Sequence, residues 1–196
     1  KPEVRIPALA GVELDRATKH LPGSTSELRR DLNETYFMHG TSPDVLLDLL
    51  AGGLNERFST VAAFGNGNYL AEDAGKNDQY VSHDPKGGAY PELHKRIYSA
   101  SAPHPDEKVY YLLVCRTTMG AFVRTTSTPG CSFQTKNLRN LDNPSEKIFP
   151  HNTRELGPIA GIKPSVLHHG LVVEREDKDA RPGDVPNLRY REFLVF

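Results

Sequence analysis

The order in which helical and strand-like patterns follow one another is the feature that most constrains the fold of this chain. Apolar residues at helical spacing, with a serine and a proline before them and two glycines after them, predict a helix over 42–53. A second short helix is expected over 72–81. Strands are expected later in the chain, over 108–117, 120–125, 168–174 and 188–196. This order favours an α+β domain with a largely antiparallel sheet rather than a βαβ series.

Residues 108–117 form the strongest strand pattern, because they are apolar nearly throughout. Such a run is typical of a strand buried on both faces, so we expect it at the centre of the sheet with 120–125 paired beside it. The polar segment 82–107 is expected to be an exposed excursion with solvated histidines. Segment 126–166 shows little periodicity, and an irregular connection of that length is often functional.

Length and composition limit the class of protein. A length of 196 residues suits one domain, so 1–196 is expected to be a single domain, with 1–33 as its lead-in. Hydrophobic residues at 37% and charged residues at 25% indicate a globular chain rather than a disordered one. The net charge of −1 provides no excess of positive charge that would attract duplex nucleic acid or an anionic membrane. No apolar run approaches the roughly 20 residues of a membrane span, so no membrane partner is expected, and a monomer is the default.

Cys115 and Cys131 are the only cysteines, and they stand in unlike sequence contexts. No Cys-x-x-Cys or His-Glu-x-x-His pattern is present, so no metal site is expected. A disulfide between the two cysteines stays open as an alternative. A reducing intracellular compartment, cytoplasm or nucleus, is the preferred location, with a secreted effector as the alternative.

The segment "FGNGNYLAED" (64–73) places two glycines one residue apart, shortly before a tyrosine. A dinucleotide-binding turn needs a third glycine three places after the second, and here Leu70 stands in that place. The glycine pair therefore has two interpretations. It forms a tight turn, or it lets the backbone pass close to a ligand.

Glu192 is the least expected residue of the final strand pattern. With a period of two it faces the same way as Leu194 and Phe196, while Phe193 and Val195 face the other way. A carboxylate among apolar neighbours is costly unless it is paired or used. The alternative is an edge strand with Glu192 at its rim, turned to water.

Six segments follow one another along the chain: "NETYFMHGT" (33–41), "GGL" (52–54), "FGNGNYLAED" (64–73), "GKNDQYV" (75–81), "YYLLVCRTTMGAFV" (110–123) and "RYREFLVF" (189–196). In this order they resemble the motifs of the poly(ADP-ribose) polymerase (PARP) catalytic domain, in the diphtheria-toxin-like branch of the ADP-ribosyltransferases. The resemblance implies the ADP-ribosyltransferase fold, a mostly antiparallel split β-sheet core flanked by short helices. It also implies transfer of ADP-ribose from NAD⁺, the co-substrate, to a protein acceptor or, as the alternative, to a nucleic acid, in mono or poly form.

The resemblance assigns a catalytic His-Tyr-Glu triad to His39, Tyr69 and Glu192. His39 would hold a hydroxyl of the adenosine ribose. Glu192 would stabilise the oxocarbenium-like transition state as the bond between nicotinamide and ribose breaks. Gly40 would offer its N–H and C=O to the nicotinamide carboxamide. The glycines of 64–73 would let the backbone approach NAD⁺.

Further residues complete the NAD⁺ site that the resemblance implies. Tyr80 would stack on one face of the nicotinamide ring, with Tyr69 on the other face. Thr41 aligns with a residue that contacts the adenosine ribose. Asn77 stands where many family members have a serine that hydrogen-bonds the nicotinamide amide. Arg57 would take over a phosphate contact that a basic residue makes in other members.

Two other functions stay open on the sequence. A catalytically inactive module that binds NAD⁺ or ADP-ribose would need the same pocket, but it has little use for the carboxylate. A toxin or effector would apply the same chemistry to a host or competitor target. Only 38 residues precede His39, so the helical regulatory domain of DNA-dependent family members is not expected in this chain. The loop 175–188, expected to help present the acceptor, does not identify it.

Overall fold

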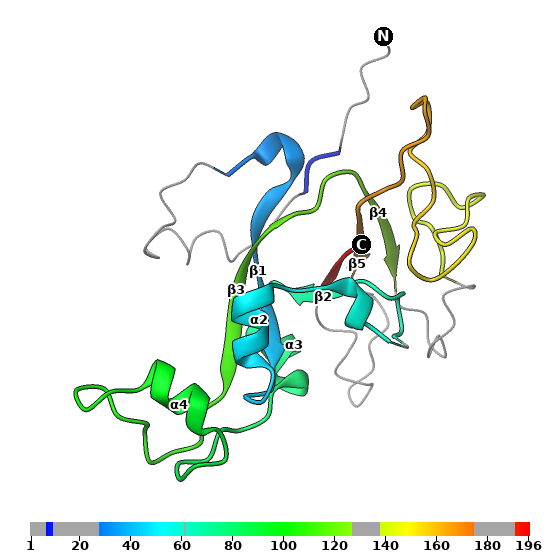
Figure 1. Ribbon diagram of the computed structural model, residues 1–196. Coiled ribbons are helices and arrows are strands. Elements are labelled where there is room, and N and C mark those ends of the chain that lie inside the picture. Colours follow the sequence, from blue (N-terminus) through cyan, green and yellow to red (C-terminus); the bar gives the residue numbers. More distant parts are fainter. Residues whose placement is uncertain (1–6, 10–27, 61, 127–137, 175–190) are drawn as a thin grey trace.

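The computed structural model describes residues 7–9, 28–60, 62–126, 138–174 and 191–196. These residues form one mixed six-stranded sheet with a few short helices around it (Figure 1). The strand order across the sheet is β3-β1-β2-β6-β5-β4. Neighbouring strands are antiparallel except β4 and β5, which run parallel. The α+β class and the mostly antiparallel pairing predicted from the sequence are therefore confirmed.

The strands differ in how firmly they are joined. Their bounds are β1 Glu34–Thr41, β2 Asn68–Ala71, β3 Tyr111–Thr118, β4 Phe122–Thr126, β5 Gly170–Glu174 and β6 Glu192–Val195. β1 pairs with β3 along its whole length, and β2 pairs with β6 over four residues. β1 and β2, in contrast, meet at a single pair, Met38 opposite Ala71. The β3-β1 part of the sheet and the β2-β6-β5-β4 part are thus narrowly connected.

The positions of two strands differ from the sequence prediction. β3 lies at an edge of the described sheet rather than at its centre, and its side chains alternate between partly buried and exposed. Leu112 and Val114 lie on its exposed side. β4 lies at the opposite edge and pairs with β5, not with β3. An apolar run predicts a central strand only where both faces are covered, and among the described residues only one face of β3 has such cover.

The hydrophobic core packs on both faces of the β6-β5-β4 part of the sheet. On one face, Leu171 and Leu194 pack with residues of the irregular segment 138–156. On the other face, Val172 and Phe193 pack with a cluster that includes Phe37, whose ring stacks on Phe193 at a centroid distance of 4.2 Å. Because successive side chains of a strand point to opposite faces, β5 and β6 are buried on both sides.

Both predicted helices are present, but the first begins later than predicted and the second is shorter. α2 spans Leu46–Gly52 and begins later than predicted, because residues 43–45 form a turn, and its N-terminus has no side-chain cap. Its end agrees with the prediction: Gly53 has a φ of 75°, and its N–H donates to the Leu49 carbonyl. α3 spans Ala74–Asn77 and is capped as expected by the Asp73 carboxylate, which accepts from the Gly75 N–H. A 3₁₀ turn, η4 (Asp78–Tyr80), continues it.

The 82–107 excursion is more ordered than its polar composition suggested. It contains a helix, α4 (Pro91–Ile97), and extends beyond one end of the sheet (green in Figure 1). Asp84 and His104 are buried in it, so the prediction that its histidines are solvated is wrong for His104. His83 is exposed, as predicted. A polar segment can bury some of its polar groups when these groups satisfy one another.

Residues 138–166 carry no helix or strand, in agreement with the sequence prediction for this part of the chain. Cys115 is a free thiol on β3, while Cys131 lies outside the described residues, as do Tyr190 and the predicted acceptor loop 175–188. Where the chain is described, its helices are too short or too polar to cross a membrane.

Candidate active site

A hollow opens beside the point where β1 and β2 separate. It is lined by His39, Gly40, Tyr69, Leu70, Ala71, Lys76, Asn77, Tyr80 and Glu192. These residues come from β1, β2, α3, η4 and β6, and they include all three members of the predicted triad. The hollow has a volume of about 110 Å³. Pockets for drug-sized ligands measure roughly 300–1,000 Å³, so this hollow can enclose a single ring rather than a whole dinucleotide.

Side chains take the place of strand pairing at this point of the sheet. Continuing the β1–β2 register beyond its single pair would place Gly40 opposite Tyr69. Instead, the Gly40 N–H donates to Asn77 Oδ1 at 2.8 Å, and His39 Nδ1 bonds to the Tyr69 carbonyl at 2.8 Å. A buried N–H and a partly buried carbonyl are thus satisfied without bringing the strands together. The hollow exists because β1 and β2 stay apart here.

The His39 contact fixes the position of the ring proton. The Tyr69 carbonyl can only accept, so His39 Nδ1 must donate to it. In the neutral imidazole, Nε2 is then the acceptor. A hydroxyl group of a ligand in the hollow would therefore donate a hydrogen bond to His39 Nε2.

Gly40 has a packing reason to be glycine. A Cβ at this position would lie 2.7 Å from the Asn77 carbonyl oxygen and 3.2 Å from Val81 Cγ1. The end of α3 therefore packs directly on the end of β1. The N–H that the family resemblance reserves for the nicotinamide carboxamide is bonded here to another primary amide, the side chain of Asn77.

Tyr69 is held by its hydroxyl group. The phenol oxygen accepts from the Phe64 N–H at 2.8 Å and donates to the Gly65 carbonyl at 3.0 Å. Burial raises the pKa of Tyr69, so the phenol keeps its proton and can act as this donor. The ring remains in the wall of the hollow, while the hydroxyl fastens the turn before β2.

The two glycines of 64–73 approach protein atoms. Gly65 has a φ of 100°, and a Cβ there would lie 2.4 Å from Phe149 Cζ and 2.9 Å from the Thr153 carbonyl. A Cβ at Gly67 would lie 2.8 Å from the Val195 carbonyl. Neither glycine lines the hollow. The close approach predicted from sequence is real, and its protein partners are the 149–153 segment and β6, while the approach to NAD⁺ stays a prediction.

Two tyrosines contribute aromatic surface to the hollow. Tyr69 comes from β2 and is partly buried, and Tyr80 comes from η4 with 54% of its surface exposed. The Lys76 ammonium lies 5.5 Å from the centroid of the Tyr80 ring, within the range of a cation–π contact. Flat aromatic surface of this kind suits a planar ligand ring.

Glu192 and Lys76 form a buried ion pair in the hollow, with 7% and 3% of their side chains exposed. Burial raises the pKa of Glu192, and the charge and hydrogen bond of Lys76 oppose that rise. β6 lies between β2 and β5, so the alternative of an edge strand with Glu192 turned to water is wrong. Lys76 was not among the residues singled out from sequence, because a lysine in a short polar helix gives no signal of burial.

A second ion pair fixes the start of β6. Arg191 donates through Nε and Nη2 to the two carboxylate oxygens of Glu72, each at 2.7 Å. Glu72 directly follows β2, and Glu192 lies opposite Ala71 in the ladder. Bidentate pairs are geometrically specific, so this contact helps to set the register that places Glu192 in the hollow.

Two predicted NAD⁺ contacts lie outside the lining of the hollow. Thr41 is buried at the end of β1. Arg57 lies on η3 (Glu56–Phe58) with 85% of its side chain exposed. The structure thus brings together His39, Gly40, Tyr69, Asn77, Tyr80 and Glu192, and leaves these two apart.

No family model matches the chain, and no curated protein matches it. The function is therefore inferred from the motifs in the sequence together with the geometry of the hollow.

Proposed function

We propose that the chain is an NAD⁺-dependent ADP-ribosyltransferase whose hollow receives the nicotinamide end of NAD⁺. The observation that carries the proposal is that His39, Tyr69 and Glu192, 153 positions apart at the extremes, line one ring-sized hollow. The fold to which the motifs are similar, the ADP-ribosyltransferase fold, belongs to the same proposal. So does a protein acceptor, with a nucleic acid as the alternative.

The lining supplies the groups that this chemistry needs. Cleavage of the nicotinamide–ribose bond builds positive charge on the ribose, as in glycoside cleavage, and the leaving group departs neutral. A carboxylate held beside that charge stabilises it best in a site that excludes water. Glu192 is a buried carboxylate of this kind, and Lys76 favours its ionised form while fixing its position.

The other residues would orient the substrate. Tyr80 and Tyr69 would hold the pyridinium ring between aromatic surfaces, which attract a flat cationic ring. His39 Nε2 would accept a hydrogen bond from a ribose hydroxyl, because Nδ1 is committed to the Tyr69 carbonyl. Orientation of this kind lowers the entropic part of the barrier.

A second candidate function is supported by the contact between Asn77 and Gly40. The Asn77 amide occupies the backbone donor that a nicotinamide carboxamide would use. A site in which this contact persists would bind ADP-ribose or hold NAD⁺ loosely without cleaving it. The protein would then be a binding module rather than an enzyme.

One experiment separates the two functions. Purified wild type and Glu192→Gln are mixed with NAD⁺, and binding is measured by calorimetry and nicotinamide release by chromatography. For a transferase we expect both proteins to bind NAD⁺, and the release rate to fall about 10²- to 10³-fold in the variant. Glu146→Gln, which changes an exposed glutamate of the irregular segment, should release nicotinamide at the wild-type rate.

The remaining outcomes are equally informative. Binding by both proteins without nicotinamide release from either supports the binding module. Equal release by wild type and Glu192→Gln contradicts the catalytic role of the carboxylate. Absence of NAD⁺ and ADP-ribose binding rejects both functions.

A further inference from the structure

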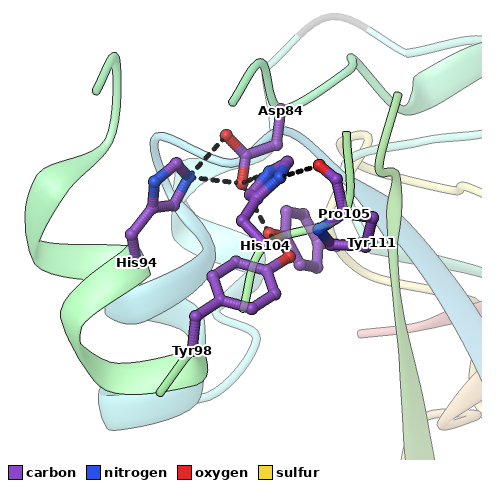
Figure 2. Close-up of polar contacts among 6 residues, drawn as sticks. All are labelled: Asp84, His94, Tyr98, His104, Pro105 and Tyr111. Atoms are coloured by element: carbon purple, nitrogen blue, oxygen red, sulfur yellow. Dashed lines mark hydrogen bonds and ion pairs between the residues drawn. The ribbon is translucent and has the colours of Figure 1, made fainter. Parts of the chain in front are cut away.

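A second cluster of chemically active side chains lies in the 82–107 excursion. Asp84, His94 and His104 place one carboxylate oxygen and two imidazole nitrogens within 4.8 Å of one another (Figure 2). We propose that these three residues bind a divalent transition-metal ion, with zinc as the best match. The proposal is independent of the NAD⁺ chemistry, because its residues do not line the hollow.

Asp84 is the centre of the cluster and is fully buried. Both of its carboxylate oxygens lie 2.8 Å from His94 Nε2. His104 Nε2 faces the same carboxylate at 3.5 Å from Oδ2. The three residues come from different local structures: Asp84 from an isolated bridge with Val109, His94 from α4, and His104 from the loop after it. Only folding brings them together.

His104 provides the observation that points to a bound cation. Its Nδ1 bonds to the Pro105 carbonyl at 2.5 Å, so Nδ1 carries the proton and Nε2 holds a lone pair. In the part of the chain that the structure describes, this Nε2 is buried and has no hydrogen-bond partner. A lone pair thus faces a carboxylate, and both groups are acceptors. A proton on Nε2 would convert the contact into an ion pair, but at 3.5 Å it would be longer than an ordinary hydrogen bond, so the nitrogen would still lack a close partner.

A metal ion fits the separation of these two acceptors. Zinc binds imidazole nitrogen at roughly 2.0–2.1 Å and carboxylate oxygen at roughly 2.0–2.2 Å, so two tetrahedral ligands lie about 3.4 Å apart. The observed separation of 3.5 Å between His104 Nε2 and Asp84 Oδ2 agrees with that value. The His94 contact at 2.8 Å would open by roughly half an ångström as its proton is replaced by the metal.

The surroundings of the cluster orient the carboxylate. The Tyr111 hydroxyl donates to Asp84 Oδ2 at 2.5 Å, and Tyr98 and Tyr111 share a hydrogen bond of 2.8 Å between their hydroxyls (Figure 2). Burial, together with the hydrogen bond to Asp84, raises the pKa of Tyr111, so this phenol remains a donor and not a ligand. Hydrogen bonds from a second ring of residues orient the ligands in many metal sites. His104 has such a support in the Pro105 carbonyl.

The donor set selects the class of ion. Two imidazoles and one carboxylate suit zinc and other first-row transition metals, whereas magnesium and calcium prefer oxygen ligands alone. Three protein ligands leave a fourth position for water. The ion would fasten α4 and the loop after it to the bridge between Asp84 and Val109, which lies just before β3.

The test uses the full chain, stripped with a chelator and dialysed. Zinc is added in a calorimetric titration, and cobalt is added separately to record the visible absorption of a tetrahedral Co²⁺ site with nitrogen and oxygen ligands. We expect one zinc per chain and a cobalt spectrum. His94→Gln and His104→Gln should each weaken zinc binding by at least about 100-fold, and Tyr111→Phe by about 10-fold.

His83→Gln is the matched control, because His83 is exposed and adjacent in sequence to Asp84. It should bind zinc with wild-type affinity. Circular dichroism reports whether each variant folds. Should His104→Gln not fold, His94→Gln and the wild-type cobalt spectrum decide, since His94 is partly exposed. Absence of stoichiometric zinc uptake by the wild type, or equal zinc affinity in His94→Gln and the wild type, would overturn the proposal.

Discussion

The side-chain carbonyl of Asn77 accepts a hydrogen bond of 2.8 Å from the backbone N–H of Gly40, inside the hollow between β1 and β2. A primary amide of the protein thus occupies the position that the proposed function gives to the amide of nicotinamide. The contact also satisfies a buried N–H that β1 and β2 leave unpaired where they separate.

Replacing Asn77 should therefore have opposite effects on stability and on ligand affinity. Asn77→Ala leaves the Gly40 N–H buried without a partner, which should lower the free energy of unfolding by about 1–3 kcal/mol. The same change frees the donor for a ligand amide, and one hydrogen bond of about 1 kcal/mol should raise nicotinamide affinity about 5-fold. Thermal denaturation and calorimetry with nicotinamide measure the two effects.

Asn77→Ser provides the comparison for this prediction. Its hydroxyl is shorter than the asparagine amide and can hydrogen-bond a ligand, so nicotinamide affinity should be at least that of Asn77→Ala. A loss of nicotinamide affinity in both variants would show that Asn77 binds the ligand instead of competing with it.

Gly65 and Gly53 allow backbone strain to be separated from steric overlap. Both have positive φ, but a Cβ at Gly65 would lie 2.4 Å from Phe149 Cζ, whereas a Cβ at Gly53 would meet no atom within 4 Å. Gly53→Ala should lower the free energy of unfolding by about 1–3 kcal/mol through strain alone, because a φ of 75° with a ψ of 178° is a conformation nearly restricted to glycine. Gly65→Ala should lower the free energy of unfolding by about 1–3 kcal/mol more than Gly53→Ala does, because its Cβ would also overpack against Phe149. Chemical denaturation measures both, and equal losses would contradict the packing role of Gly65.

The two tyrosines of the hollow should respond differently to substitution. Tyr69→Phe removes a hydroxyl that bonds the backbone of residues 64 and 65, so the free energy of unfolding should fall by about 1–2 kcal/mol while the ring remains. Tyr80→Ala removes an exposed ring, so stability should change by less than about 0.5 kcal/mol. NAD⁺ affinity should fall in Tyr80→Ala and change little in Tyr69→Phe. The opposite pattern in calorimetry would refute the stacking role of Tyr80.

Activity should depend on pH through Glu192. Burial raises the pKa of this carboxyl above that of a free glutamate, and Lys76 limits the rise. Nicotinamide release, which needs the ionised form, should therefore fall at acidic pH, with a midpoint above the pKa of a free glutamate. Lys76→Gln removes the positive charge, so the midpoint should move to higher pH. A profile that is identical in Lys76→Gln and wild type would contradict the coupling of the pair.

The raised pKa of Glu192 also determines how the stability of the folded protein changes with pH. The folded state binds the Glu192 proton more tightly than the unfolded state, so this carboxyl favours folding below the pKa of a free glutamate. That contribution is lost as the pH rises through the folded pKa. The stability of wild type should therefore fall from pH 4 to pH 8 relative to that of Glu192→Gln, which has no carboxyl to titrate at this position, and denaturation at both pH values would measure the change.

Local sequence patterns predicted several elements but not their neighbours. The strand patterns around 108–117, 168–174 and 188–196 correspond to β3, β5 and β6, and the Asp73 cap of α3 was also predicted. The apolar run of β3 led to the wrong place in the sheet, because a strand's composition does not say which faces other segments cover. Likewise, nothing in 82–107 indicated that His94 and His104 meet at Asp84.

By itself, the sequence determined the α+β class and the residue types available to the hollow, since periodicity and capping act over a few neighbouring residues. Tertiary structure alone decided that Lys76 pairs with Glu192, that Asn77 bonds to Gly40, and that the glycines of 64–73 pack on protein. These contacts join positions that are far apart along the chain. Their geometry depends on how strands and helices pack in three dimensions, which no local pattern encodes.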